Sequence, residues 1–243
     1  MDYIIAAQTE AEFQHYHRIS KDIQPILENF LKFLKAEYAV NELPNTVVLT
    51  NLEIATQSLS NIPLPGYTNE FRTVFCPDIH SWRKIYLHQL DDHDNQKARH
   101  FYETELTQQH ILQILGHEFV HHSDLFIDEA YDKARWFEEG MCEYISRKYF
   151  LSESQFQESI QINRIIVELQ QINTLRRPLE DFSSSTYSHS YSCIFYEYWR
   201  SFLAVHQIMD RFEGDIHKVF AAYREWYQYD PRQSLSNWFH VSI

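Results

Sequence analysis

The spacing of apolar residues near the start of the chain predicts a long helix. Between Glu10 and Tyr38, apolar side chains recur every three or four residues, which is the spacing of one helix face. Pro25 lies inside this segment, so we expect a helix start or a kink there. The apolar side of this helix comprises Phe13, Tyr16, Ile23, Ile26, Leu27, Phe30, Leu31 and Leu34.

Three short segments that follow are typical of β-strands. Residues 45–50, 71–75 and 84–88 have the β-branched and aromatic content that strands favour. Residues 61–70 contain two prolines and Gly66, which indicates a loop. We therefore expect a small sheet of mostly antiparallel strands.

Beyond residue 105 the pattern is almost entirely helical. Apolar positions predict helices at about 107–123, 136–149, 155–175, 190–212 and 215–228, with a short one after Pro231. The predicted fold class is therefore α+β. We expect one domain over residues 1–243, with a small N-terminal α/β lobe (1–124) and a mainly helical C-terminal lobe (125–243).

The amino-acid composition limits the kinds of molecule that the protein is expected to bind. A hydrophobic content of 44% is typical of a packed globular protein, and a net charge of −13 argues against nucleic acid and anionic membranes as partners. Residues 1–20 lack the pattern of a signal peptide, and we see no apolar run long enough to span a membrane. Three cysteines without a C-x-x-C pair indicate reduced thiols, so we expect a cytoplasmic protein.

One pentapeptide carries recognisable chemistry. Residues 117–121 read His-Glu-Phe-Val-His, inside the predicted helix that begins after Thr107. Residues four apart share a helix face, so His117 and His121 can bind one metal ion together. Glu118 can then act as a base on a water at that metal without being a ligand. His122 points away from His121 and is expected at the surface or behind the ligands.

A second segment offers the third metal ligand. Glu139 and Glu143 lie four residues apart in Trp-Phe-Glu-Glu-Gly-Met-Cys-Glu-Tyr (136–144), so both face one way on a helix. Glu139 can complete a His₂Glu site, and Glu143 can accept a hydrogen bond from a ligand imidazole, with His117 the first choice. Glu138 is the rival ligand. Cys142 lies beside the proposed ligands, but its side chain is expected to project away from the Glu139/Glu143 face and so not to touch the metal.

Together the two motifs resemble those of the gluzincin metallopeptidases, the thermolysin-like clan, over residues 116–144. The resemblance implies a zincin-like fold with the active site in a cleft between the two lobes, one bound Zn²⁺, and a peptide or protein substrate. It assigns the third zinc ligand to Glu139, and it places residues 84–90 as the strand that pairs with an extended substrate. The G-x-M-E-N segment of the clan's aminopeptidases and the thermolysin N-E-x-x-S-D motif are absent, which marks a divergent member.

A tetrahedral intermediate also needs a hydrogen-bond donor besides the metal. Related enzymes supply a Tyr or His from the C-terminal lobe, and Tyr191 is the first choice here, followed by His189 and Tyr187. The resulting hypothesis is a zinc metallopeptidase with Glu118 as general base. Two alternatives stay open: a non-catalytic metal-binding or partner-binding scaffold, and an accidental motif without metal. The sequence leaves the oligomeric state and the cleavage specificity open.

Overall fold

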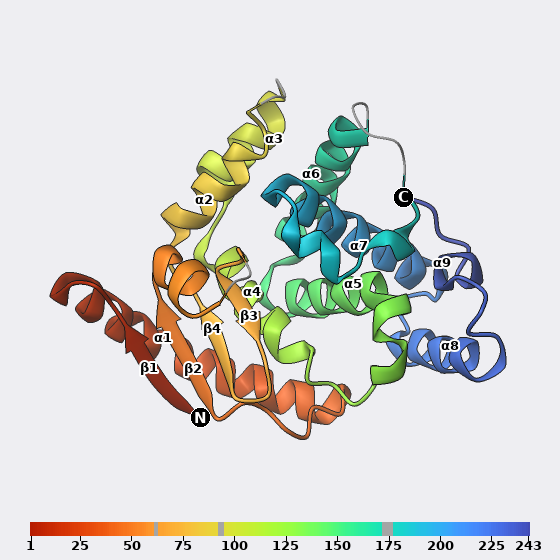
Figure 1. The fold of residues 1–243 in the computed structure, drawn as a ribbon, viewed down its shortest axis with the longest axis horizontal. Helices are drawn as coiled ribbons and strands as arrows, with labels where there is room; N and C mark the ends of the chain where they lie inside the picture. Colours follow the sequence, from red (N-terminus) through yellow and green to blue (C-terminus); the bar gives the residue numbers. More distant parts are fainter. Residues whose placement is uncertain (61–62, 92–94, 172–176) are drawn as a thin grey trace.

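A computed structural model describes residues 1–60, 63–91, 95–171 and 177–243. The N-terminal part comprises β1 (Asp2–Ala6), α1 (Glu10–Glu37), β2 (Thr46–Thr50), β3 (Gly66–Thr68), β4 (Arg72–Phe75), α2 (Ile79–His88) and α3 (Gln96–His100). The remainder comprises α4 (Gln108–Val120), α5 (Tyr131–Phe150), α6 (Glu153–Gln171), α7 (Tyr191–Arg211), α8 (Ile216–Tyr229) and α9 (Leu235–Trp238), with short helical turns between several of them. The α+β fold class is confirmed, with a small sheet near the N-terminus followed by helices (Figure 1).

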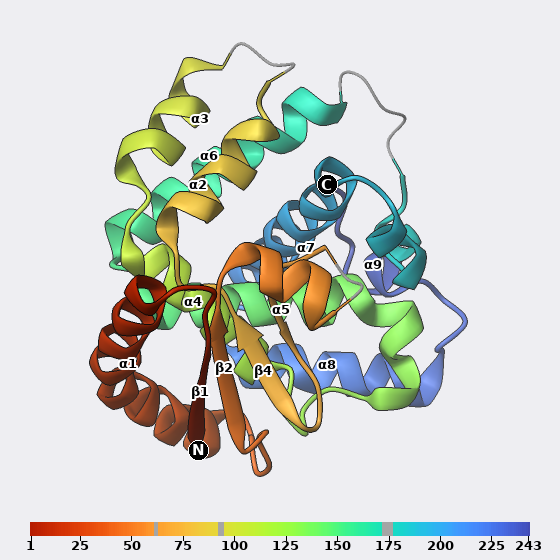
Figure 2. The same ribbon diagram turned by 60° about the vertical axis from the view of Figure 1, so that its left-hand side comes forward.

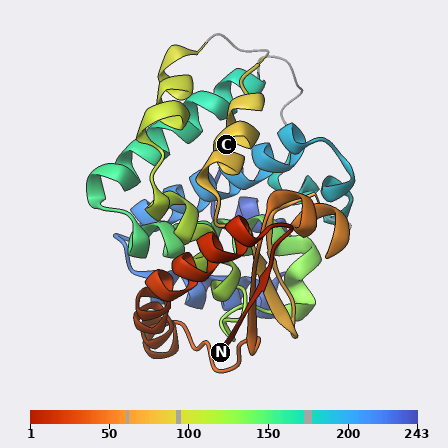
Figure 3. The ribbon, with the colours of Figure 1, turned by 90° about the vertical axis from the view of Figure 1, so that its left-hand side faces the viewer.

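The direction of strand pairing differs from the expectation. The sheet has the order β1-β2-β4-β3, and only the β3–β4 pair is antiparallel. The expected mostly antiparallel sheet is therefore wrong. The reason is α1, which carries the chain from the end of β1 back to the start of β2, as a parallel pair requires. Figure 3 shows α1 beside the strands on the side that faces the viewer.

The segment predicted as a third strand is a helix. Residues 84–88 lie in α2, whose first turn is capped by Asp78 through hydrogen bonds from the backbone amides of His80 and Ser81. Trp82 and Ile85, three residues apart, form its buried side. The substrate-pairing strand expected at residues 84–90 is therefore wrong. The edge strand beside the helical part is β3, inside the segment expected to be a loop.

The predicted helices of the second part are confirmed to within a few residues at most ends, although α5 begins earlier, at Tyr131. The helix expected over 155–175 is described up to Gln171, and the positions beyond it lie outside the described residues. Thr107 caps α4 as expected, because its hydroxyl and backbone amide both bond the His110 ring. In the described part of the chain, no helix combines the length and apolar character that a membrane crossing needs.

One large apolar core links the sheet to the helices. α4 lies between the sheet and α5, and α5 in turn packs against α7 (Figure 1). α3 packs on α6, which makes a second link between the two parts (Figure 2). α5 and α7 approach each other closely at Gly140 in α5, where an added Cβ would clash with the carbonyl oxygen of Ser201 in α7. This close packing of α4, α5 and α7 fixes the positions of the side chains that the motifs singled out.

Candidate metal centre

The His-Glu-x-x-His segment forms the buried C-terminal end of α4. His117 and His121 are one turn apart, and their Nε2 atoms lie 3.1 Å from each other. The His117 side chain is almost fully buried, whereas that of His121 keeps an opening to the surface. Both imidazoles therefore present the same nitrogen to one point in space.

α5 brings a carboxylate to the same point. Glu139 Oε2 lies 3.1 Å from His117 Nε2 and 3.3 Å from His121 Nε2. Ligands placed tetrahedrally at the usual zinc distances are separated from each other by about 3.3 Å. The two imidazole nitrogens and the carboxylate oxygen thus occupy three corners of a tetrahedron of the size that zinc requires, and the donor set suits this ion.

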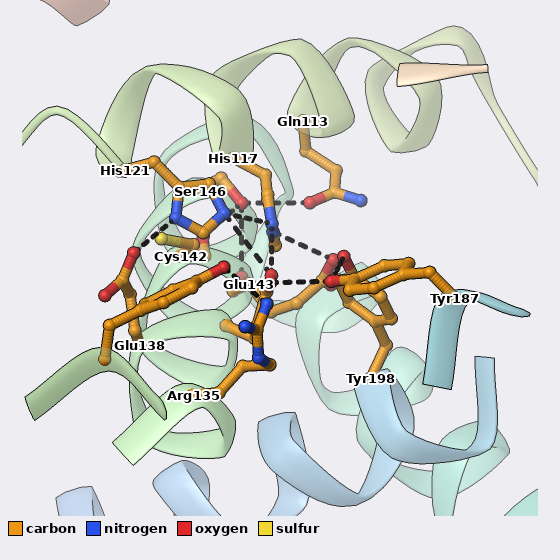
Figure 4. Close-up of polar contacts among 12 residues, drawn as sticks. Gln113, His117, His121, Arg135, Glu138, Cys142, Glu143, Ser146, Tyr187 and Tyr198 are labelled. Atoms are coloured by element: carbon orange, nitrogen blue, oxygen red, sulfur yellow. Dashed lines mark hydrogen bonds and ion pairs between the residues drawn. The ribbon is translucent and has the colours of Figure 1, made fainter. Parts of the chain in front are cut away.

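Two further carboxylates face the opposite nitrogens of the imidazoles (Figure 4). Glu143 Oε1 lies 3.1 Å from His117 Nδ1, although the contact is too bent to be a hydrogen bond. Glu138 Oε1 lies 2.8 Å from His121 Nδ1. Glu138, the rival ligand in the sequence, thus sits behind His121 rather than at the point where the two Nε2 atoms meet. Carboxylates in such places fix the orientation and basicity of metal-binding imidazoles.

The electrostatics of the site favour charged carboxylates and protonated imidazoles while no metal is bound. Burial alone would lower the pKa of His117, but Glu139 and Glu143 raise it to about 9. Burial alone would raise the pKa of Glu139, but the two imidazoles hold it well below its usual range. Arg147 and His117 likewise lower the pKa of Glu143 to about 2 against the effect of burial. Metal binding must therefore displace protons from the imidazoles.

Glu118 has the environment of a general base. Its side chain lies at the boundary of two cavities and is buried. Burial raises the pKa of Glu118, and the nearby carboxylates Glu139 and Glu143 add to this effect, while the imidazoles oppose it. A carboxylate with a raised pKa can accept a proton and hold it long enough to pass it on.

Cys142 lies nearer the site than the sequence suggested. Its Sγ lies within 4.8 Å of ligand nitrogens of His117 and His121, so the expectation that it projects away from the metal is wrong. Figure 4 shows the sulfur below the His121 ring, on the Glu138 side. Burial raises the pKa of the Cys142 thiol to about 12 while no metal is bound. Glu139 Oε2 completes a triangle with the two Nε2 atoms whose sides are 3.1 to 3.3 Å, so the geometry favours Glu139 over Cys142 as third ligand.

Two cavities meet at Glu118. One is a small pocket, and the other is a larger cleft. One wall of the pocket is aromatic and aliphatic, formed by Leu64, Trp82, Tyr86, Ile114, Phe195 and Trp199, and the rest is formed by Gly66, His117, Glu118, Glu143, Arg147 and Tyr198. The cleft is lined by Tyr67, Thr68, His121, Tyr131, Arg135, Glu138, Glu139 and Tyr187, among others. Both parts of the chain thus contribute to the cleft.

The edge strand β3 borders both cavities. Gly66 lines the pocket and the cleft, whereas Thr68 lines the cleft. An added Cβ at Gly66 would lie 3.1 Å from the Ile114 side chain, so β3 approaches α4 closely. His122, at the end of α4, bonds Thr68 at 2.8 Å and does not join the ligand cluster. This bond fixes the edge strand beside the candidate metal ligands.

The structure brings Tyr187 to the site, but not the two donors preferred from the sequence. Tyr187 donates a hydrogen bond to Glu139 Oε1 at 3.0 Å, and its hydroxyl lies 3.0 Å from that of Tyr198. Tyr191 stacks on Phe195 at the start of α7, and His189 is exposed. Neither lines the pocket or the cleft described above.

Three residues of the site were missed from the sequence. Tyr198 lines both cavities, and Tyr131 and Arg135 line the cleft. A signal existed for Arg135, because it precedes Glu139 by four residues and so shares its helix face. Tyr198 offered no such signal, since nothing in its spacing distinguishes it from the other aromatic residues of α7.

Comparison with known proteins gives one match. No curated protein and no solved structure matches the chain significantly. The model of the collagenase family, Peptidase M9, matches residues 84–237, which include α4 and α5 but not the sheet. The match agrees with the gluzincin clan but does not single out the thermolysin-like assignment. Because it covers more than half of the chain, the protein belongs to the collagenase family of zinc metallopeptidases.

Proposed function

We propose that this protein hydrolyses peptide bonds with one zinc ion held by His117, His121 and Glu139. The observation that carries the proposal is the triangle of His117 Nε2, His121 Nε2 and Glu139 Oε2, with sides of 3.1 to 3.3 Å, beside a buried carboxylate. When bound, zinc supplies a Lewis acid that polarises a carbonyl group and makes water more acidic.

The chain's own residues supply the proton transfers and the positioning. Glu118 takes a proton from the attacking water and delivers it to the leaving amine. Tyr198 lines both cavities at Glu118, and in the substrate-free protein it donates its proton to the Tyr187 hydroxyl. On substrate binding Tyr198 exchanges this partner and donates a hydrogen bond to the oxygen that becomes negative in the tetrahedral intermediate. Tyr187 holds Glu139 and the Tyr198 hydroxyl in place.

The substrate backbone pairs with β3. This strand is the last one in the sheet order, so its outer edge is available for an extended peptide. Antiparallel pairing, the more stable arrangement, runs the peptide from Thr68 towards Gly66. The residue after the scissile bond then lies at the smaller pocket, and the residue before it lies in the cleft.

The test combines metal analysis with cleavage assays. We expect protein purified without chelators to contain one zinc per chain and to cleave members of a quenched-fluorescence peptide library. Gelatin and collagen belong in the substrate panel because of the family match. Glu118→Gln should keep the zinc and lose cleavage, whereas Glu129→Gln, an exposed matched change, should keep both. Cleavage by Glu118→Gln at the wild-type rate would refute the mechanism, and bound zinc without cleavage of any peptide would favour the scaffold alternative.

A further inference from the structure

We infer that Arg135 forms a carboxylate-binding subsite in the cleft, so that the substrate carries a carboxylate next to the scissile bond. This inference rests on the proposed function, because it names the substrate class of the same site. The inference goes beyond the proposed function in two respects. It gives a role to Arg135, which is neither a proposed zinc ligand nor the general base, and it names a chemical group of the substrate that peptide hydrolysis in general does not require.

Arg135 has the placement of a recognition residue. It lies on α5 one turn before Glu139 and is only 5% exposed, yet it lines the cleft. The guanidinium carbon lies 4.1 Å from the centre of the Tyr131 ring and 5.9 Å from that of Tyr187. Figure 4 shows the side chain extending from α5 towards the ligand cluster. The two aromatic rings thus hold the charged group in a fixed orientation at the wall of the cleft.

The hydrogen-bonding capacity of this guanidinium is only partly used. One terminal nitrogen donates to the Tyr131 hydroxyl at 2.6 Å. The Nε atom is buried and has no hydrogen-bond partner among the described residues. The Nε atoms of Arg83 and Arg200 are buried without such a partner as well, so this feature alone does not mark a ligand site. Arg135 differs from both because its side chain also lines the cleft.

The charge of Arg135 also lacks a close counterion. Among the described residues, Arg135 forms an ion pair with Asp132 at 3.6 Å. The Asp132 side chain is 92% exposed, so water screens this pair and it neutralises little of the buried charge. By contrast, Arg147 holds Glu143 at 2.6 Å and Arg200 holds Glu197 at 3.0 Å. Glu139 is nearby, but its oxygens bond His117 and Tyr187. Buried charges are costly without a partner, so the site favours an anion supplied by the substrate.

The chemistry of the donors selects a carboxylate. A planar guanidinium matches the two oxygens of a carboxylate, and the Tyr131 hydroxyl, which accepts from Arg135 and keeps its own proton, adds a neutral donor beside it. In the antiparallel arrangement on β3, the cleft receives the part of the peptide that precedes the scissile bond. The expected ligand is an Asp or Glu side chain there. A C-terminal carboxylate has the same chemistry and is the second source to be tested.

Binding to an inactive variant tests the inference separately from cleavage. Zinc-loaded Glu118→Gln protein is titrated with labelled peptide libraries in which one position at a time is Asp, Glu, Asn or Gln, each with a free or an amidated C-terminus. We expect the acidic peptides to bind about 10- to 100-fold more tightly than their amide counterparts at one position. Loss of this preference on C-terminal amidation alone would assign the subsite to the chain terminus instead of a side chain.

Variants of Arg135 decide whether this residue is responsible. In the same background, Arg135→Gln should remove the preference and leave the affinity for neutral peptides unchanged, and Arg135→Lys should keep part of it. Arg224→Gln, an exposed change on α8, should alter nothing. A preference that persists in Arg135→Gln, an equal loss of affinity for all peptides, or no preference in the parent would each overturn the inference. If Arg135→Gln does not fold, Arg135→Lys takes its place: a reduced preference for acidic peptides supports the inference, and an unchanged preference overturns it. If the wild-type protein cleaves nothing, the proposed function fails while the binding result still stands.

Discussion

Arg147 holds the carboxylate of Glu143 through two nitrogens, each 2.6 Å from Oε2, on the side of Glu143 away from His117. This pair fixes the carboxylate that faces His117 Nδ1 at 3.1 Å. Removing such support from a metal-binding imidazole costs about 10- to 100-fold in metal affinity. We therefore expect Glu143→Gln to weaken zinc binding by that factor, and Arg147→Gln by somewhat less.

Competition with a chromogenic chelator measures this effect. Lys148→Gln, the neighbouring residue on the more exposed side of α5, serves as the control and should leave zinc affinity unchanged. An equal loss in the control would show that α5 itself has been weakened, and an unchanged affinity in Glu143→Gln would contradict the role of this carboxylate.

Zinc binding should depend on pH between about 6.5 and 9. The pKa of His117 in the metal-free protein is raised to about 9. Protonated His117 stabilises the folded state, and this contribution is complete at pH values below about 6.5, the pKa of His in the unfolded chain. The contribution is lost as the pH rises through about 9, the pKa of His117 in the folded protein. We expect the melting temperature of metal-free protein to fall over this range and zinc affinity to rise, because protons compete with the ion.

Thermal melting at several pH values, with and without zinc, tests this dependence. His117→Asn should weaken the pH dependence of the metal-free protein without abolishing it, because the pKa of His121 is raised as well. A change of the exposed His240 to Asn should preserve the full dependence. If the melting temperature of the metal-free protein does not change between pH 6.5 and 9, then His117 does not have the raised pKa from which this prediction follows.

Glu138 and Glu139 should differ in their effect on the metal. Glu139 lies at the point where the two Nε2 atoms meet, whereas Glu138 bonds the far side of His121. We expect Glu139→Gln to lower zinc affinity by more than about 100-fold and Glu138→Gln by about 10- to 100-fold or less. The zinc content of each variant after dialysis against a weak chelator shows which substitution weakens binding more. A larger loss in Glu138→Gln than in Glu139→Gln would make Glu138 the ligand.

Local periodicity was enough to predict much of this structure. The helices beyond residue 105 follow from apolar spacing, and the spacing of Glu139 and Glu143 predicted the side of α5 that faces His117. Both are properties of a single helix, and a helix keeps its geometry wherever it packs. The same reasoning would have found Arg135, one turn before Glu139.

The errors concern relationships between distant segments. β1 and β3 are short, and their pairing depends on β2 and β4 rather than on their own sequences. Residues 84–88 have strand-like composition, but the Asp78 cap and the buried pair Trp82 and Ile85 make them helical. The choice among the tyrosines stays a prediction, although Tyr187 and Tyr198 line the cavities and Tyr191 does not. The direction of a side chain at the start of α7 depends on how the preceding turn packs, and no spacing encodes that.

The packing of α5 against α7 should be sensitive to one glycine. An added Cβ at Gly140 would clash with the Ser201 carbonyl, which is backbone and cannot rotate away. We expect Gly140→Ala to cost about 1–3 kcal/mol of folding free energy. Gly214→Ala is the comparison: its φ of +78° brings strain of about 1 kcal/mol, but no atom lies within 4 Å. Denaturant titration measures both, and a smaller cost at Gly140 would contradict the close approach.

Substitutions of Tyr198, Tyr187 and Tyr191 should affect catalysis and zinc binding differently. Tyr198 lines both cavities beside Glu118, whereas Tyr187 bonds Glu139 and Tyr191 stacks on Phe195 away from the cavities. If Tyr198 stabilises the oxyanion, Tyr198→Phe should lower kcat by about 10²–10³ and change KM little. Tyr187→Phe should instead weaken zinc binding, and Tyr191→Phe should resemble the wild type. Steady-state kinetics on a cleaved peptide, at saturating zinc and after metal quantification, distinguish these effects. A larger loss of kcat in Tyr191→Phe than in Tyr198→Phe would restore the residue first chosen from the sequence.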